Sequence, residues 1–143
     1  MTDTVREQIL TALATRVAAE RAPLYELLVE DTVLPVTALS AGTDGVERIE
    51  YGATHVVMTV TAERVDRLAA GVNPSSAANA LLGALISEAT GTDRTLGGLC
   101  EDLQYAGGSE LPRESGSELA GASATFSVRY AFVIGDPGSS PLA

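Results

Sequence analysis

The alternating run near the end of the chain is the feature that most constrains the fold. Aromatic and aliphatic side chains occupy every second position there: Phe126, Val128, Tyr130, Phe132 and Ile134. Successive side chains of a strand point to opposite faces of a sheet, so this period of two predicts a strand with one apolar face. Gly135-Asp136-Pro137 follows at once and predicts the end of that strand.

Two segments carry helix signals. Thr4 and Glu7 have the spacing of a capping box, and apolar residues recur at helical spacing after them as far as Val17. They predict a helix near residues 4–20, ended by Pro23. Asn73-Pro74 has the form of a helix start, and the apolar stripe behind it predicts a helix near residues 75–90. Residues 24–32 fit neither period well.

Further strands are predicted on both sides of the second helix. Residues 33–39 read as a strand in which Pro35 indicates an edge position or a start after the proline. Residues 40–45 are dense in turn formers, and residues 46–51 alternate weakly, as an arm of a hairpin does. Residues 55–61 and 101–105 are also expected to be strands. The Gly-rich stretch 107–121 predicts a flexible loop.

This order of elements predicts an α+β fold, with a mostly antiparallel sheet of four to five strands and two helices packed on one face. A length of 143 residues suits one domain, and a hydrophobic content of 45% is enough for a core. We expect a single domain over residues 1–137 and a flexible C-terminal tail over residues 138–143.

Charge and composition exclude several functions. The net charge is −10, which repels phosphates and argues against dedicated nucleic-acid binding. All nine basic residues are arginines, so no lysine is present for a P-loop or a Schiff base. No stretch approaches the roughly 20 apolar residues of a membrane helix, and residues 1–4 lack a signal-peptide pattern. A single cysteine predicts synthesis in a reducing compartment.

Residues suited to catalysis or metal binding are sparse. His55 and Cys100 stand alone, whereas a zinc site needs three or four such ligands. We interpret His55 as an ordinary sheet histidine among apolar and Thr neighbours. Cys100 precedes Glu101 and Asp102, which raise a thiol pKa, so it reads as an inert thiol. The adjacent carboxylates Glu30-Asp31 and Glu101-Asp102 point apart and form no natural dyad. We expect no catalytic residue, metal or cofactor.

The C-terminal half resembles a known family. The run 93–99 (DRTLGGL), a Gly-rich loop, the strand containing Val128-Arg129-Tyr130 and the closing Gly135-Asp136-Pro137 look like the tail-terminator and minor tail proteins of long-tailed bacteriophages. The first helix, the strand starting near Pro35 and the central strand over residues 55–61 also fall in the order that this family uses. The resemblance therefore covers most of the chain in layout, with its sharper motifs over residues 93–137.

The resemblance implies a structural role. It implies a hexameric ring that caps the head-proximal end of the tail tube, stops its polymerisation and gives the head-completion or neck protein a docking surface. DNA would pass through the lumen without specific binding, no membrane would be involved, and the ring would assemble in the host cytoplasm and stay in the virion tail. Candidate subunit-interface residues are Arg94, Arg129, Asp136, Asp44, Glu47 and Arg113.

Three alternatives remain open at this point. A head-completion, neck or other tail-completion protein would share the same general fold. A small α+β enzyme or ligand-binding domain would need an acidic cluster in a cleft. A regulatory dimer would pair through an exposed strand edge and have two-fold symmetry.

Overall fold

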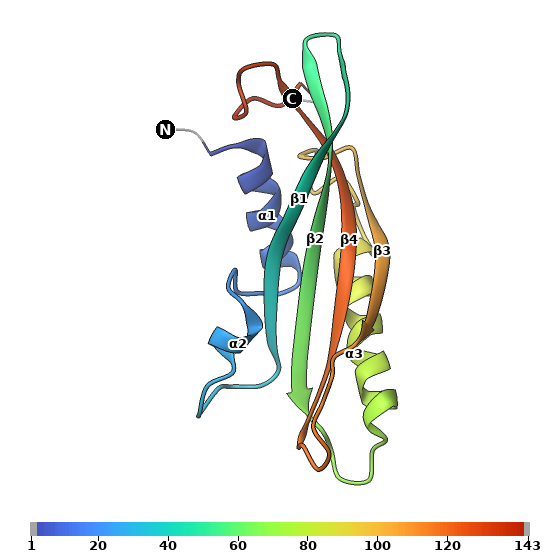
Figure 1. The fold of residues 1–143 in the computed structure, drawn as a ribbon. Coiled ribbons are helices and arrows are strands. Elements are labelled where there is room, and N and C mark those ends of the chain that lie inside the picture. Colours follow the sequence, from blue (N-terminus) through green and yellow to red (C-terminus); the bar gives the residue numbers. More distant parts are fainter. Residues whose placement is uncertain (1–2, 142–143) are drawn as a thin grey trace.

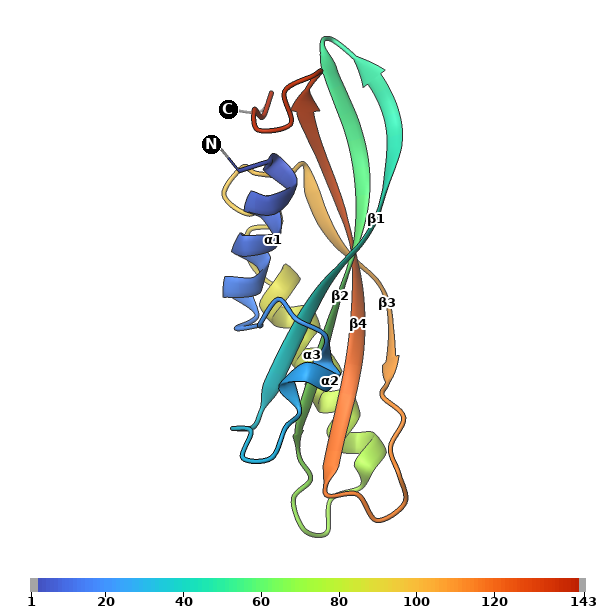
Figure 2. The ribbon, with the colours of Figure 1, turned by 60° about the vertical axis from the view of Figure 1, so that its left-hand side comes forward.

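Four long strands and two longer helices make up the molecule. The computed structural model describes residues 3–141, in the order α1 (Val5–Arg16), α2 (Leu24–Leu27), β1 (Val36–Glu50), β2 (Ala53–Arg67), α3 (Pro74–Thr90), β3 (Asp102–Glu110) and β4 (Leu119–Val133). The strands form one antiparallel sheet in the order β1-β2-β4-β3, and α1 and α3 lie on one face of it (Figures 1 and 2). The predicted α+β fold is confirmed.

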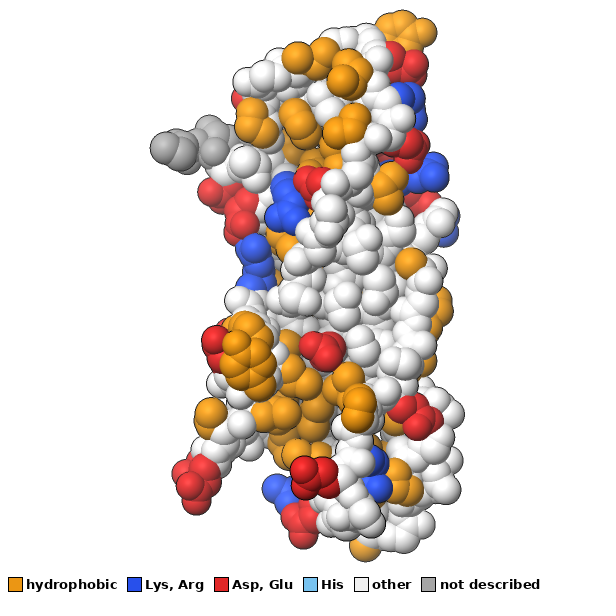
Figure 3. Space-filling model, in the orientation of Figure 1, with side chains coloured by type: hydrophobic (Ala, Val, Ile, Leu, Met, Phe, Trp, Pro, Cys, Tyr) orange, Lys and Arg blue, Asp and Glu red, His pale blue; other side chains and the backbone are white. Residues whose placement is uncertain are grey.

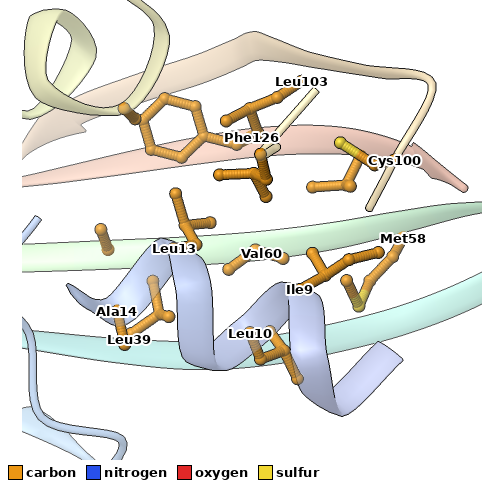
Figure 4. Packing of buried hydrophobic residues seen from close by; sticks show 14 of the residues in the cluster. Ile9, Leu10, Leu13, Ala14, Leu39, Met58, Val60, Cys100, Leu103 and Phe126 are labelled. Atoms are coloured by element: carbon orange, nitrogen blue, oxygen red, sulfur yellow. The ribbon is translucent and has the colours of Figure 1, made fainter. Parts of the chain in front are cut away.

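The core lies between this sheet face and the two helices. Along β2 and β4 most even-numbered residues face the helices and are buried, among them Met58, Val60, Phe126 and Val128. Figure 4 shows Ile9, Leu10 and Leu13 of α1 against these strands, as the helical spacing predicts. Since fully burying each such side chain contributes about 1.5–3 kcal/mol, this layer is the main stabilising feature.

The first helix is shorter than predicted. Thr4 Oγ1 accepts a hydrogen bond from the Glu7 amide, so the predicted N-cap is correct. The Glu7 carboxylate, however, pairs with Arg21 instead of returning to Thr4. The helix ends at Arg16 because Ala18 adopts a φ of 52°, and the Ala19 amide donates back to the Ala14 carbonyl. This is the closing hydrogen bond of a Schellman motif, with alanine where glycine is usual.

The predicted turn at residues 40–45 is wrong, because β1 runs unbroken through it to Glu50. Two irregularities in its pairing with β2, between Ala41 and Asp44 and between Val46 and Arg48, absorb the extra residues as β-bulges. The strand begins after Pro35 and lies at the edge of the sheet, as predicted. The hairpin arm expected over residues 46–51 is the upper end of this strand.

The predicted flexible loop over residues 107–121 is also wrong. β3 continues to Glu110 and β4 begins at Leu119, so only residues 111–118 connect them. Glycine is needed there for close packing: a Cβ on Gly108 would lie 2.7 Å from the Ser123 carbonyl oxygen, and one on Gly121 would lie 2.8 Å from Leu111 Cδ1. The predicted helix near 75–90 is correct, with Asn73 accepting hydrogen bonds from the Ser75 and Ser76 amides.

A buried arginine ties the helices to the sheet. Arg64 Nε donates to Thr37 Oγ1 at 2.7 Å, and Nη2 donates to the Val17 carbonyl at 2.8 Å. Its two terminal nitrogens also bind both carboxylate oxygens of Glu88 at 2.7 and 2.8 Å. This guanidinium therefore joins the end of α1, β1, β2 and α3, and it lowers the pKa of Glu88 through the hydrogen bonds and its charge.

Candidate interaction surface

A hairpin arm projects past the helices at one end of the sheet. We define the arm as residues 44–55, the end of β1, the turn at Tyr51-Gly52 and the start of β2. Both ribbon views show it extending beyond α1, with the C-terminal segment beside its base (Figures 1 and 2). Tyr51 and Gly52 have φ values of 53° and 74°, which suit the tight two-residue turn that joins such strands.

The two faces of the arm differ in chemistry. Val46 pairs with Val56 and Ile49 with Thr54, so their side chains continue the helix-covered face past the end of the helices. Val46 and Ile49 are each 64% exposed and Tyr51 is 98% exposed, while Ile134 at the end of β4 is 54% exposed. Figure 3 shows hydrophobic side chains gathered at this end. The arm is therefore apolar on one face, and nothing in the described chain covers that face.

The base of the arm is held to α1 and β4. Asp44 Oδ2 accepts a hydrogen bond from the Tyr130 hydroxyl at 2.8 Å, and its Oδ1 accepts one from Arg6 Nε at 3.0 Å. Arg6 Nη2 also donates to the Gly42 carbonyl at 2.8 Å. Burial, together with the hydrogen bond to Asp44, raises the pKa of Tyr130, which keeps the hydroxyl protonated as a donor. These contacts fix the direction in which the arm leaves the body.

The other face of the sheet carries a row of alternating charges at the same end. We call it the charged row; from β3 to β1 its members are Arg94, Asp102, Arg129, Glu47, Arg48 and Glu50. Arg94 Nε lies 3.4 Å from Asp102 Oδ1, and Arg129 Nε lies 3.6 Å from Glu47 Oε2. Arg48 contacts Glu47 at 3.3 Å and Glu50 at 3.0 Å. Asp102 and Arg129 are direct cross-strand partners.

Below the charged row, the same face of the sheet is polar and mostly uncharged. Thr59, Thr61, Ser123, Thr125 and Ser127 face outward from β2 and β4. At the far end α2 crosses onto this face, where Leu24 and Leu28 line an open groove of about 230 Å³ together with Val65 and Leu111. Figure 3 shows the polar middle part as a mostly white area between two hydrophobic ones.

Three of the six predicted interface residues come together. Arg94, Arg129 and Glu47 belong to the charged row, although no pattern in the sequence indicates that they lie side by side. Asp44 instead lies under the arm, bound to Arg6 and Tyr130. Arg113 lies at the opposite end, where it donates to the Ser117 and Leu119 carbonyls. Asp136 accepts a hydrogen bond from the Ser139 hydroxyl in the C-terminal segment.

That C-terminal segment also makes backbone contacts. The Val133 amide donates to the Ser139 carbonyl, and the Val5 amide donates to the Pro137 carbonyl at 2.8 Å. The flexibility expected for residues 138–143 stays a prediction, and residues 142 and 143 lie outside the described part of the chain.

His55 has a charged neighbour that the sequence did not indicate. Its Nδ1 lies 2.9 Å from Glu101 Oε1, so the expectation of apolar and Thr neighbours alone is wrong. Cys100 is buried, and burial together with the charge of Asp102 raises its pKa to about 12, in the direction predicted from its neighbours. Within residues 3–141, no three His, Cys, Asp or Glu side chains lie close enough to hold a metal ion.

The comparisons with known proteins add no family. No protein-family model matches the sequence, and no curated protein matches it significantly. No helix of the described chain is long and apolar enough to cross a membrane.

Proposed function

We propose that this protein is a structural assembly subunit that forms a ring on the head-proximal end of a bacteriophage tail tube, where it ends tube growth and presents a docking surface for the head. Its partners are other copies of itself, the tail tube protein and a head-completion or neck protein. No catalytic step is part of this role.

The uncovered apolar face of the hairpin arm carries the proposal. Val46, Ile49 and Tyr51 are large hydrophobic residues held away from the core on a rigid, anchored hairpin. A soluble monomer rarely keeps such side chains together in contact with water, and a patch of this kind marks a protein–protein contact. The arm points along the strands, which suits a contact with the next layer of a stacked assembly.

Ring formation is supported by the two edges of the sheet. β1 and β3 are the outer strands, and they run in opposite directions because three antiparallel pairings separate them. A neighbour related by rotation about an axis near the strand direction therefore presents β3 against β1 with antiparallel polarity. Contacts between two different patches, repeated by a rotation that closes, produce a ring.

The uncovered sheet face supports passage of DNA through such a ring. Its middle part carries Ser and Thr side chains, and the arginines of the charged row are each paired with a carboxylate. If this face lines the lumen, DNA phosphates meet few unpaired cations, and the net charge of −10 opposes tight binding.

The mass of the purified protein, measured by light scattering on a size-exclusion column with and without tail tube protein, tests the proposal. We expect a closed oligomer, or a monomer that assembles on tube ends, and we expect added protein to stop tube elongation seen by electron microscopy. A monomer or two-fold dimer that leaves tube length unchanged would contradict it. Binding to a neck protein but not to tubes would identify a head-completion protein instead.

A further inference from the structure

We infer that the charged row is the lateral contact with a second copy of this chain, with Arg94 at the β3 edge of one copy meeting Glu50 at the β1 edge of the next. This inference rests on the proposed ring and names the surface that closes it.

The order of charges along the row is the first argument. Positive and negative groups alternate over six side chains, from Arg94 through Asp102, Arg129, Glu47 and Arg48 to Glu50. Each interior member has an opposite charge on both sides. The row therefore compensates its own charge inside one copy, and only its two end members have an opposite charge on one side alone.

Those ends lie at opposite edges of the sheet and carry opposite charges. The Arg94 side chain is 56% exposed, with Asp102 as its ion-pair partner in the row, and the Glu50 side chain is 47% exposed, with Arg48 as its partner. Arg94 borders the outer strand β3, and Glu50 lies in the outer strand β1. Glu50 lies opposite Ala53, four residues nearer the tip of the arm than Val57, which is level with Arg129 and Asp102. A copy beside the β3 edge therefore brings its Glu50 to Arg94 when the strands tilt relative to the ring axis, as strands do in closed barrels. The alternation then continues from one copy into the next.

Charge complementarity also selects the type of contact. A two-fold contact that brings the same ends of two β3 edges together would place Arg94 beside Arg94, and one that brings the same ends of two β1 edges together would place Glu50 beside Glu50. Like charges placed together at an interface are costly, whereas a head-to-tail contact pairs opposite charges at every step. A polyanion fits the row poorly, because its arginines already have carboxylate partners. The row therefore favours a ring of identical copies over a two-fold dimer.

Bulges in both edge strands indicate that side chains carry much of this contact. The pairing of β1 is irregular on both sides of Val46, and that of β3 is irregular between Tyr105 and Gly107. Bulged edges oppose continuous strand pairing between molecules. An ionic contact between two side chains does not require a continuous row of backbone hydrogen bonds between the edge strands of the two copies.

A charge exchange tests the pairing in the full-length protein. Arg94→Glu or Glu50→Arg alone is expected to raise the midpoint concentration for assembly about fivefold, the effect of one exposed ion pair of ~1 kcal/mol. Combining both changes is expected to restore most of the assembly. Circular dichroism verifies the fold, and Glu114→Arg at the far end is the matched control. The inference would be overturned if both single variants assembled at the same midpoint concentration as the parent. It would also be overturned if the increases in midpoint concentration of the two single variants simply added in the double variant.

A disulfide test locates the contact directly. Three strand spacings, about 14 Å, separate the two edges within one copy, so cysteines at positions 94 and 50 of one chain cannot bridge a limit of ~7 Å between Cα atoms. Arg94→Cys with Glu50→Cys is expected to give a ladder of linked chains ending in a closed ring on non-reducing gels. Buried Cys100 does not compete. Arg94→Cys with Glu114→Cys is the control and should stay unlinked.

The outcomes separate this inference from the proposed function. If the 94–50 pair stays unlinked while the parent protein forms a ring that caps tubes, the inference is wrong and the function stands. If the ring depends on the charged row but does not cap tubes, the inference stands and the function is wrong.

Discussion

Arg64 is the charged residue that the fold buries among those described, with its side chain 9% exposed. Its hydrogen bonds reach Thr37, Val17 and Glu88, which come from three separate parts of the chain. Removing one partner of a buried polar network leaves the other groups unsatisfied, and this costs more than the network contributes when intact. The position therefore matters for stability far more than a surface arginine does.

We expect Arg64→Ala to lower the free energy of unfolding by about 2–4 kcal/mol in urea denaturation, because the Val17 carbonyl and the Thr37 hydroxyl lose their donor. The value stays below the upper range for buried pairs, since the Glu88 side chain is 39% exposed and can be hydrated. Arg67→Ala is the control: that side chain is 68% exposed and should change stability by less than ~0.5 kcal/mol. Equal effects in the two variants would contradict this account.

Residues with local roles were predictable, and those with long-range roles were not. The caps at Thr4 and Asn73 follow from a few neighbouring residues, and the structure confirms both. Arg64 sits beside Glu63 near the end of a strand, where a charged residue suggests solvent. Only the packing of α1 and α3 against β2 buries it. The charged row was missed for the same reason, because its six members come from four separate segments.

At the scale of elements, the strands are longer than local propensity indicates. Residues 40–45 contain Gly42 and Gly45 and read as a turn, yet β1 passes through them because β2 offers a full-length partner. The long-range pairing outweighs the turn preference, and a bulge takes up the difference. The alternation that predicts the last strand is clear only where aromatic residues occur. The first residues of β4, 119–121, therefore fall within the predicted loop, and residues 122–125 carry no clear strand signal.

The two glycines of β1 differ in how much space they leave for a side chain. A Cβ on Gly42 would lie 2.7 Å from the Thr59 carbonyl oxygen, whereas the nearest atom to one on Gly45 is 3.9 Å away. We expect Gly42→Ala to destabilise the fold by about 1–3 kcal/mol through this clash, and Gly45→Ala to leave it within ~0.5 kcal/mol. Thermal unfolding of both variants checks the difference, and a reversed order would refute it.

The hairpin arm gives a prediction about assembly. Val46→Ser with Ile49→Ser removes apolar surface that the monomer leaves in water, so the monomer should keep its unfolding temperature within ~2 °C. The affinity for tail tubes, measured by co-sedimentation, should fall at least tenfold, because the contact loses two apolar side chains that it would bury. Val72→Ser is a control on an exposed residue of the loop before α3. Unchanged binding of the double variant would remove the arm from the contact.

For the molecule as a whole, stability should fall in acid. The hydrogen bonds and charge of Arg64 lower the pKa of Glu88, and hydrogen bonds from Thr95 and Gly97 lower the pKa of Asp93 to about 2. A lowered pKa in the folded state contributes stability that is present above the unfolded pKa, near 4, and is lost as the pH falls through the folded value. The free energy of unfolding should therefore decline from about pH 5 to pH 2.

Glu88→Gln isolates one part of this dependence. Lowering the pH also reduces the net charge of −10 and its self-repulsion, which acts in the opposite direction. Both proteins share that effect, so the difference between them reports the ionised form of Glu88. We expect the parent to have the larger free energy of unfolding at pH 7, and the difference from the variant to shrink as the pH falls below the ordinary pKa of a glutamate. A constant difference across this range would show that the charge of Glu88 has no role.

The pairing between β2 and β4 has a mechanical consequence. All fifteen residues of each strand are matched, from Ala53 with Val133 to Arg67 with Leu119, without a bulge. A tensile load along the strands acts in shear on this ladder, so its hydrogen bonds share the force rather than breaking one after another. The β2–β4 pair at the centre of the sheet therefore resists extension, while the bulged outer strands deform more easily and let the edges adapt to their neighbours.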